Sequence, residues 1–182
     1  MGAGELWPFE VVALLWLLPR VRARVAYPTP PPNIQLGTKQ NTGHGKAYIP
    51  ERLAALANAG ISGDVADAIL AHWALETGWG HGEWNFNVGN RMALKGEPAI
   101  DLGVGPRWFR AYESLAAGVA DYLQLLRGPR FARAWEMLNA APSSGAWIAE
   151  LVRQGYAGAV AARAYVDGVT GCLRRIHAQK NA

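Results

Sequence analysis

Apolar residues recur at helical spacing through most of residues 46–182. In residues 63–77 they follow the i, i+3, i+4 rule, with Ser62 suited to cap the start and Gly78 to end the helix. Pro50 fits the first turn of a helix over 51–59, and Ser114 is suited to cap a helix that runs to 126. Further helices are predicted over 130–139, 146–154 and 159–177.

Residues 81–113 are rich in glycine and aromatic residues and show no long helical period. Turns and a short hairpin, pairing 99–102 with 107–110, are predicted there. The pattern as a whole indicates an α+β fold that is mostly helical, with a small β-hairpin lobe in the middle.

The first 45 residues have a different character. The apolar run 11–18 is far shorter than the roughly 20 residues that span a bilayer. Acidic residues precede it and arginines follow it, which is the reverse of the usual signal-peptide order and argues against a cleaved signal. Prolines at 28 and 30–32 predict a stiff spacer, and 33–45 is predicted to be loop or linker. We therefore expect an N-terminal arm, residues 1–45, that docks on a partner protein or a membrane surface, ahead of a domain at 46–182.

Composition narrows the class of protein. Of the 182 residues, 51% are hydrophobic and 18% charged, so the chain is apolar enough to fold around a core. One cysteine, Cys172, excludes an internal disulfide and a multi-cysteine metal site. The net charge is +4, but no Lys/Arg run carries interleaved aromatics, which argues against nucleic-acid binding. His72 and Glu76 are four residues apart without an H-E-x-x-H motif, so we expect no metal and no cofactor.

The stretch Ala-His-Trp-Ala-Leu-Glu-Thr-Gly-Trp-Gly, residues 71–80, is the most informative. Glu76 ends an apolar helix, where desolvation would raise the pKa of its carboxyl group and suit it to general acid catalysis. The glycines after it would leave room for a substrate, and Trp79 and Trp84 offer faces for stacking on a sugar ring. The alternative is a surface glutamate in the last turn of a helix.

Residues 74–80 resemble the catalytic-helix motif of the glucosaminidases of glycoside hydrolase family 73, a lysozyme-like family that cleaves peptidoglycan. Four further segments are similar to that family and occur in its order, from about residue 50 to 176. The segment at 84–90 is closest to the N-x-N-x-G-N form of phage-encoded members, whereas the first 45 residues have no counterpart. The similar segments are residues 84–90, 108–114, 120–126 and 155–157 with Tyr165.

The resemblance implies that Glu76 is the catalytic acid and that Asn85, Asn87 and Gly89 shape the floor of a cleft. It also implies that Tyr165 and Tyr112 line the sugar subsite, with core packing as the alternative for both tyrosines. Departures from the family pattern leave the cleft shape and substrate register open; they lie at Val88, Asn90, Arg91, Gly158 and Ala159.

A second carboxylate commonly works opposite the acid in glycoside hydrolysis. Asp101 and Glu97, both in the predicted hairpin, are equal candidates, and Glu83 is nearer in sequence but lies in a turn. A mechanism with one glutamate, which releases an anhydro sugar by internal attack, stays open as well.

Together these features predict a peptidoglycan hydrolase that cleaves β-1,4 bonds between amino sugars, as a glucosaminidase, a muramidase or a lytic transglycosylase. The arm predicts attachment to a larger assembly such as a phage particle, and hence a virion-associated protein or one exported to the cell envelope. The alternative is a non-catalytic glycan-binding or structural component of a virion or secretion apparatus.

Overall fold

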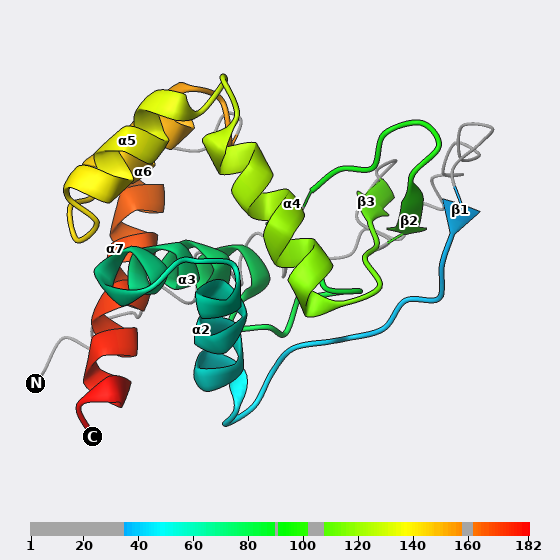
Figure 1. Ribbon diagram of the computed structural model, residues 1–182, viewed down its shortest axis with the longest axis horizontal. Helices are drawn as coiled ribbons and strands as arrows, with labels where there is room; N and C mark the ends of the chain where they lie inside the picture. Colours follow the sequence, from blue (N-terminus) through cyan, green and yellow to red (C-terminus); the bar gives the residue numbers. More distant parts are fainter. Residues whose placement is uncertain (1–34, 90, 102–107, 158–161) are drawn as a thin grey trace, which may run out of the picture.

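The computed structural model describes residues 35–89, 91–101, 108–157 and 162–182. Within these ranges six helices gather on one side of the molecule and a three-stranded sheet lies at the other end (Figure 1). Helix α4 runs between the two parts (Figure 1). The helices are α2 (Tyr48–Asn58), α3 (Gly63–Thr77), α4 (Leu115–Arg127), α5 (Ala132–Ala140), α6 (Ala146–Arg153) and α7 (Ala162–Lys180).

Helix α3 is the centre of the core. Ile69, Leu70 and Trp73 are completely buried on it, and its apolar residues surround the helix rather than forming one stripe. Helix α7 packs closely against α3. The side chain of Leu75 lies directly against Gly168 of α7, where a Cβ atom would come within 3.0 Å of it. A helix enclosed in this way holds its last turn, which carries Glu76, in a fixed place.

The sheet is small and consists of strands of two to four residues. Strand β2 (Pro98–Asp101) pairs antiparallel with β3 (Trp108–Arg110), with Ile100 opposite Phe109. Strand β1 (Gln35–Leu36) pairs parallel with β2 on its other edge. The predicted hairpin is thus confirmed along its strands, while residues 102–107 lie outside the described part of the chain.

The predicted helices are confirmed with small shifts at their ends, and the fold is the mostly helical α+β class that the pattern indicated. Ser114 caps α4 as expected, since its hydroxyl accepts a hydrogen bond from the Ala117 amide. Ser62 occupies the N-cap position of α3 in an extended conformation, but its side chain makes no capping hydrogen bond. Within the part of the chain that the structure describes, no helix is both long enough and apolar enough to cross a bilayer.

The prediction of a loop or linker over 33–45 is wrong for Gln35–Leu36, which form β1, and the loop at 37–43 is joined to the domain by hydrogen bonds. Besides the pairing of β1, the backbone of Gln40 exchanges hydrogen bonds with the backbone and side chain of Asn85. The backbone of Thr42 donates to the carbonyl of Glu83 at 3.0 Å. Two-residue strands give no period in the sequence, which is why the pattern missed them. The rest of the predicted arm, residues 1–34, lies outside the described residues.

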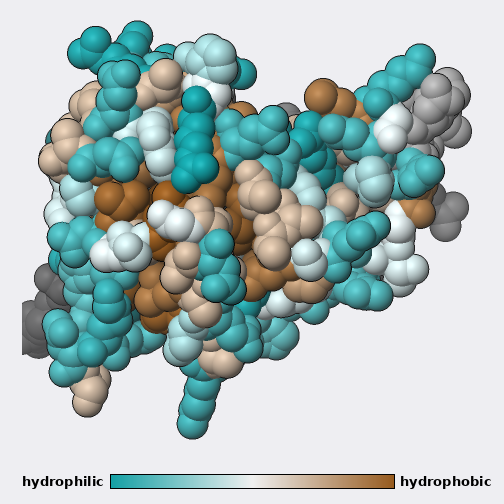
Figure 2. All heavy atoms as spheres, viewed as in Figure 1, coloured by the Kyte–Doolittle hydropathy of each residue, from teal (hydrophilic) through white to brown (hydrophobic). Residues whose placement is uncertain are grey.

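The surface follows this division of the fold. Apolar residues gather over the helical part in the face that Figure 2 shows, whereas hydrophilic residues cover most of the part around the sheet (Figure 2). Three large apolar side chains are exposed among the described residues, namely Leu36, Met92 and Leu94. All three lie on or beside the sheet, so this end of the molecule mixes polar groups with apolar faces.

Candidate active site

Glu76 lies in the last turn of α3, with 15% of its side chain exposed. The helix ends directly after it, because Gly78 adopts the left-handed conformation with φ 56°. Trp79 and Gly80 also have positive φ, so the chain turns away sharply at this point. The carboxyl group therefore stands at a helix end, mostly shielded but reachable.

The space beside Gly80 is not a space for substrate, contrary to our expectation. A Cβ atom on Gly80 would lie 1.4 Å from the carbonyl oxygen of Gly43. The glycine is needed because the segment 38–43 crosses the turn here. Gly78, by contrast, has no neighbouring atom within 4 Å of a Cβ position.

A chain of buried polar groups ends on Glu76. The hydroxyl of Tyr165, on α7, donates a hydrogen bond to Oε1 of Glu76. His72, one turn before Glu76 on α3, lies with its Nε2 2.8 Å from the same hydroxyl. Its Nδ1 is hydrogen-bonded to the hydroxyl of Tyr122 on α4. Three helices thus contribute to one hydrogen-bonded chain.

Burial keeps His72, Tyr122 and Tyr165 neutral. Burial lowers the pKa of His72 to about 3, since the imidazolium would lose its hydration. Burial, and secondarily the charge of Glu76, raises the pKa of the Tyr122 and Tyr165 hydroxyls well above 10. Both tyrosines therefore remain hydrogen-bond donors at any physiological pH.

The segment 87–89 packs on this cluster. A Cβ atom on Gly89 would lie 2.7 Å from the Tyr122 ring, so only glycine permits the contact. The hydroxyl of Tyr156 donates to the carbonyl of Gly89 at 3.1 Å, and its ring lies 4.9 Å from that of His72. Gly89, a predicted site residue, thus lies next to the hydrogen-bonded chain that ends on Glu76.

Asn85 and Asn87 hold backbone segments together. The side chain of Asn85 bonds the backbone of Gln40 and Thr38, both at 2.9 Å. Asn87 is buried, and its amide nitrogen donates to the carbonyls of Arg91 and Arg110. These contacts hold the backbone around the turn in place, and they occupy the side chains themselves; a role in the floor of a cleft stays a prediction. Direct contact with substrate stays a prediction for both residues.

The two predicted stacking tryptophans each have one face occupied. The guanidinium of Arg175 lies 4.4 Å from the Trp79 ring centroid, and the indole N–H of Trp79 is buried without a hydrogen-bond partner. The ammonium of Lys39 lies 4.1 Å from the ring centroid of Trp84. For Trp79 the geometry favours packing against the core, while stacking on a sugar stays a prediction for both.

Tyr112 belongs to an ionic network beside α4. Its hydroxyl donates to Asp121 at 2.6 Å, and Arg91 and Arg110 bridge the same carboxylate at 2.9 and 2.5 Å. Burial, followed by the bond to Asp121, raises the pKa of Tyr112 above its usual value. Through these contacts Tyr112 helps to hold the sheet lobe against α4.

The three carboxylates considered as partners of Glu76 have different surroundings. Glu83 is fully buried, 2.5 Å from Arg52, and accepts the indole N–H of Trp73 at 2.8 Å, which makes it part of the core. Glu97 accepts from the Leu94 amide at 2.6 Å and from Arg110 at 2.8 Å. Asp101 is exposed at the end of β2.

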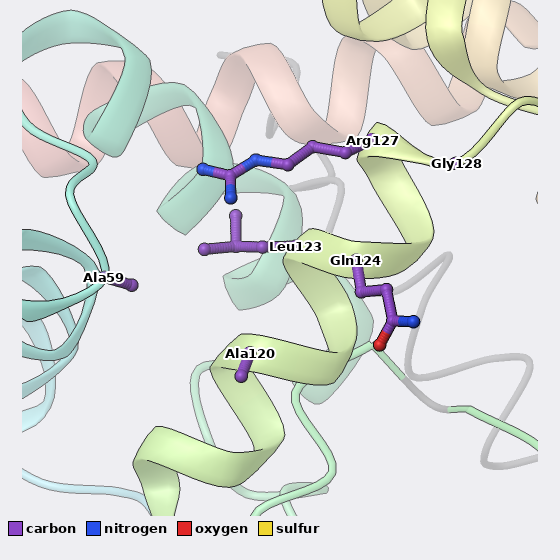
Figure 3. Close-up of a pocket in the computed structure, with 6 residues that line it drawn as sticks. All are labelled: Ala59, Ala120, Leu123, Gln124, Arg127 and Gly128. Carbon is purple, nitrogen blue, oxygen red and sulfur yellow. The ribbon is translucent and has the colours of Figure 1, made fainter.

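Two surface hollows flank α4. One, of about 500 Å³, lies between the α2–α3 connection and α4, where the side chains of Leu123 and Arg127 extend toward Ala59 (Figure 3). None of its six lining residues is a carboxylate, so it is unsuited to acid catalysis. The other, of about 560 Å³, is charged, and Glu97, Asp121, Arg91, Arg110 and Arg130 are among its lining residues.

Sequence reasoning missed the support beneath Glu76. His72 was considered only as a metal ligand, although its i−4 spacing already placed it on the glutamate's side of α3. No group of three or more His, Cys, Asp or Glu side chains able to hold a metal occurs among the residues described. Tyr122 and Tyr156 carried no local signal, since only the tertiary fold brings them to His72.

A partly exposed glutamate at the end of a buried helix, held by a tyrosine hydroxyl, is chemically suited to general acid catalysis. Comparison with known families agrees: the sequence model described as mannosyl-glycoprotein endo-beta-N-acetylglucosaminidase matches residues 53–178. The chain therefore belongs to the glucosaminidase family of glycoside hydrolases. No curated protein and no solved structure matches it.

Proposed function

We propose that the protein hydrolyses β-1,4 glycosidic bonds between the amino sugars of peptidoglycan, with Glu76 as the catalytic acid. The observation that carries this is the placement of Glu76, 15% exposed at the end of α3 and hydrogen-bonded to Tyr165. The match of residues 53–178 to the glucosaminidase family supports the chemistry and the amino-sugar substrate. The N-acetylglucosaminidase specificity is the one we propose.

In the reaction, Glu76 donates its proton to the bridging oxygen as the bond from that oxygen to the anomeric carbon breaks. The leaving sugar departs with a new hydroxyl group, and positive charge develops on the remaining ring. Water then adds to the anomeric carbon and loses a proton to a base, which completes hydrolysis. If a hydroxyl of the same sugar attacks instead, the product is an anhydro sugar and no water is consumed.

Asp101 and Glu97 are the two candidates for the base. Both oxygens of Glu97 already accept hydrogen bonds, one from Arg110 and one from the Leu94 amide, so Glu97 is held as part of the sheet lobe. Asp101 lies exposed at the end of β2. We expect only one of the two substitutions, Asp101→Asn or Glu97→Gln, to lower kcat by a factor of about 100 or more, and the other to lower it far less.

The deciding experiment is digestion of purified peptidoglycan with the full chain and with Glu76→Gln, followed by mass spectrometry of the products. New reducing N-acetylglucosamine ends support the proposed specificity. Reducing muramic acid ends would make the protein a muramidase, and anhydro ends would make it a transglycosylase. Absence of any cleavage by the wild-type protein would overturn the proposal.

We further propose that the N-terminal segment attaches the enzyme to a larger assembly, such as a phage particle, or to a membrane surface. The apolar run 11–18, the arginines after it and the prolines at 28 and 30–32 support this. Because β1 belongs to the sheet, the test compares the full chain with one that starts at Gln35 rather than at Lys46. Loss of co-sedimentation with retained digestion supports the proposal, and unchanged co-sedimentation contradicts it.

A further inference from the structure

The buried chain from Tyr122 to Glu76 has a direction that can be worked out from its donors and acceptors. A neutral histidine has one N–H donor and one bare nitrogen acceptor. Tyr165 donates its one hydroxyl hydrogen bond to Oε1 of Glu76. Its oxygen must therefore accept from His72, which places the imidazole proton on Nε2, 2.8 Å away.

The other end of the chain requires the same direction. With its proton on Nε2, His72 has a bare Nδ1, which accepts a hydrogen bond from the hydroxyl of Tyr122. In the reverse direction Nδ1–H would donate to Tyr122, whose own proton would then need another acceptor. Among the hydrogen bonds of the described residues, that hydroxyl has His72 as its partner, and Tyr122 is 1% exposed. A buried unsatisfied donor costs free energy, so the first direction is favoured.

We propose that His72 is a positioning residue: held as the Nε2–H tautomer between Tyr122 and Tyr165, it fixes the Tyr165 hydroxyl as a donor to Oε1 of Glu76. The consequence is that a protonated Glu76 carries its transferable proton on Oε2. This inference rests on the proposed role of Glu76 as the acid. His72 itself neither touches substrate nor exchanges a proton.

The surroundings of His72 keep its tautomer constant. The ionisable residues that face the ring are Glu76 on the same helix, with Oε1 3.8 Å from Nε2, and three tyrosines, Tyr122 from α4, Tyr165 from α7 and Tyr156 from the segment after α6. The ring is completely buried, and Trp147 of α6 packs edge-on at 5.8 Å. Burial lowers the pKa of His72 to about 3, so it stays neutral while Glu76 gains and loses its proton.

Fixing the donor also matters after the proton has left. The newly formed carboxylate accepts the hydrogen bond from the Tyr165 hydroxyl without any reorientation of that hydroxyl. This bond stabilises the negative charge that develops on Glu76 in the transition state. If His72 is replaced by an apolar residue, Tyr165 loses the hydrogen bond that polarises it and can rotate away. The carboxylate form of Glu76 is then less favoured, and Glu76 keeps its proton to a higher pH.

The test uses the full chain in three variants: His72→Leu, His72→Gln and Tyr122→Phe. An amide can donate to Tyr165 and accept from Tyr122, so His72→Gln should keep kcat on peptidoglycan within about threefold. His72→Leu should lower kcat at least tenfold with KM changed less than twofold, and should move the alkaline limb of the pH profile of kcat upward. Tyr122→Phe, the more conservative change, should lie between the two.

The tautomer is measured directly by ¹⁵N NMR of the histidine-labelled protein, with His72→Gln identifying which of the four histidines is His72. We expect Nε2 protonated and Nδ1 bare from pH 8 to pH 5 in the wild type, and a mixture of tautomers in Tyr122→Phe. An Nδ1–H tautomer in the wild type overturns the inference, as do kcat and pH profiles of Tyr122→Phe and His72→Leu that match the wild type. If the wild type cleaves no peptidoglycan, the proposed function fails, whereas the NMR result still decides the direction of the chain.

Discussion

The guanidinium of Arg52 lies 2.5 Å from the carboxylate of Glu83, and both side chains are almost completely buried. Arg52 also donates to the carbonyl of Thr42 at 3.0 Å, and Gly43 leaves the space that the guanidinium occupies. The pair therefore joins α2, the segment 38–43 and the turn after α3. It fixes the position of the turn that directly follows Glu76.

Glu83→Gln should lower the free energy of unfolding by about 3–5 kcal/mol, since it removes the buried counter-ion of the Arg52 charge and leaves only the exposed Glu51 as its partner. The matched control is Glu51→Gln, because Glu51 pairs with the same guanidinium at 2.8 Å but is 59% exposed. An exposed pair contributes less than about 1 kcal/mol. Denaturant unfolding measures both. Equal effects of the two substitutions would contradict the structural role of Glu83.

Glu76→Gln should lower the rate of peptidoglycan cleavage by a factor of about 100 to 10,000, because an amide cannot supply the proton for the leaving oxygen. The side chain is nearly isosteric and still accepts the Tyr165 hydroxyl, so the thermal unfolding midpoint should stay the same. The rate is measured by release of reducing ends and the midpoint by circular dichroism. Activity within threefold of wild type, with an unchanged midpoint, would falsify the assignment.

Two glycines with similar backbone angles separate strain from steric conflict. Gly60 and Gly80 have φ of 79° and 85°, but a Cβ atom meets nothing within 4 Å at Gly60 and meets the Gly43 carbonyl at Gly80. Gly60→Ala should cost about 1–2 kcal/mol of unfolding free energy from the left-handed conformation alone. Gly80→Ala should cost at least about 2 kcal/mol more, since the segment 38–43 must move. Equal costs would show that this segment is not fixed at the turn.

The helices and the hairpin could be predicted because their signals are local. Periodicity, the Ser114 cap and the glycines after α3 all act within a few residues of one another. Strand β1 could not be predicted, since two residues carry no alternation and the pairing with Pro98 and Ala99 joins positions more than 60 residues apart.

The candidate site likewise has one part that local sequence predicts and one part that it does not. Glu76 could be found because its helix, its neighbours and the following glycines lie in one segment. The hydrogen-bonded chain that supports it could not be found. The resemblance indicated Tyr165 only as a subsite residue, and Tyr122 and Tyr165 reach His72 from helices 50 and 93 residues further along the chain. The same limit explains Glu83, whose burial depends on Arg52, 31 residues before it. A carboxylate's role is set by partners that sequence spacing alone does not reveal.

The buried His72 should make the protein less stable as the pH falls below neutrality. In the unfolded chain its pKa is about 6.5, whereas burial lowers the folded pKa to about 3. Between these values only the unfolded state binds the proton, so stability is complete above about pH 6.5 and is lost progressively toward pH 3. The loss attributable to this residue between pH 7 and pH 5 is about 2 kcal/mol.

The measurement is denaturant unfolding of wild type, His72→Gln and His44→Gln at pH 7, 6 and 5. His44→Gln is the comparison at an exposed histidine. His72→Gln, which has no titrating ring at this place, should lose less stability between pH 7 and pH 5 than the wild type by about 2 kcal/mol. Parallel curves for His72→Gln and wild type would mean that the folded protein protonates His72 in this range, and the neutral hydrogen-bonded chain to Glu76 would then be wrong.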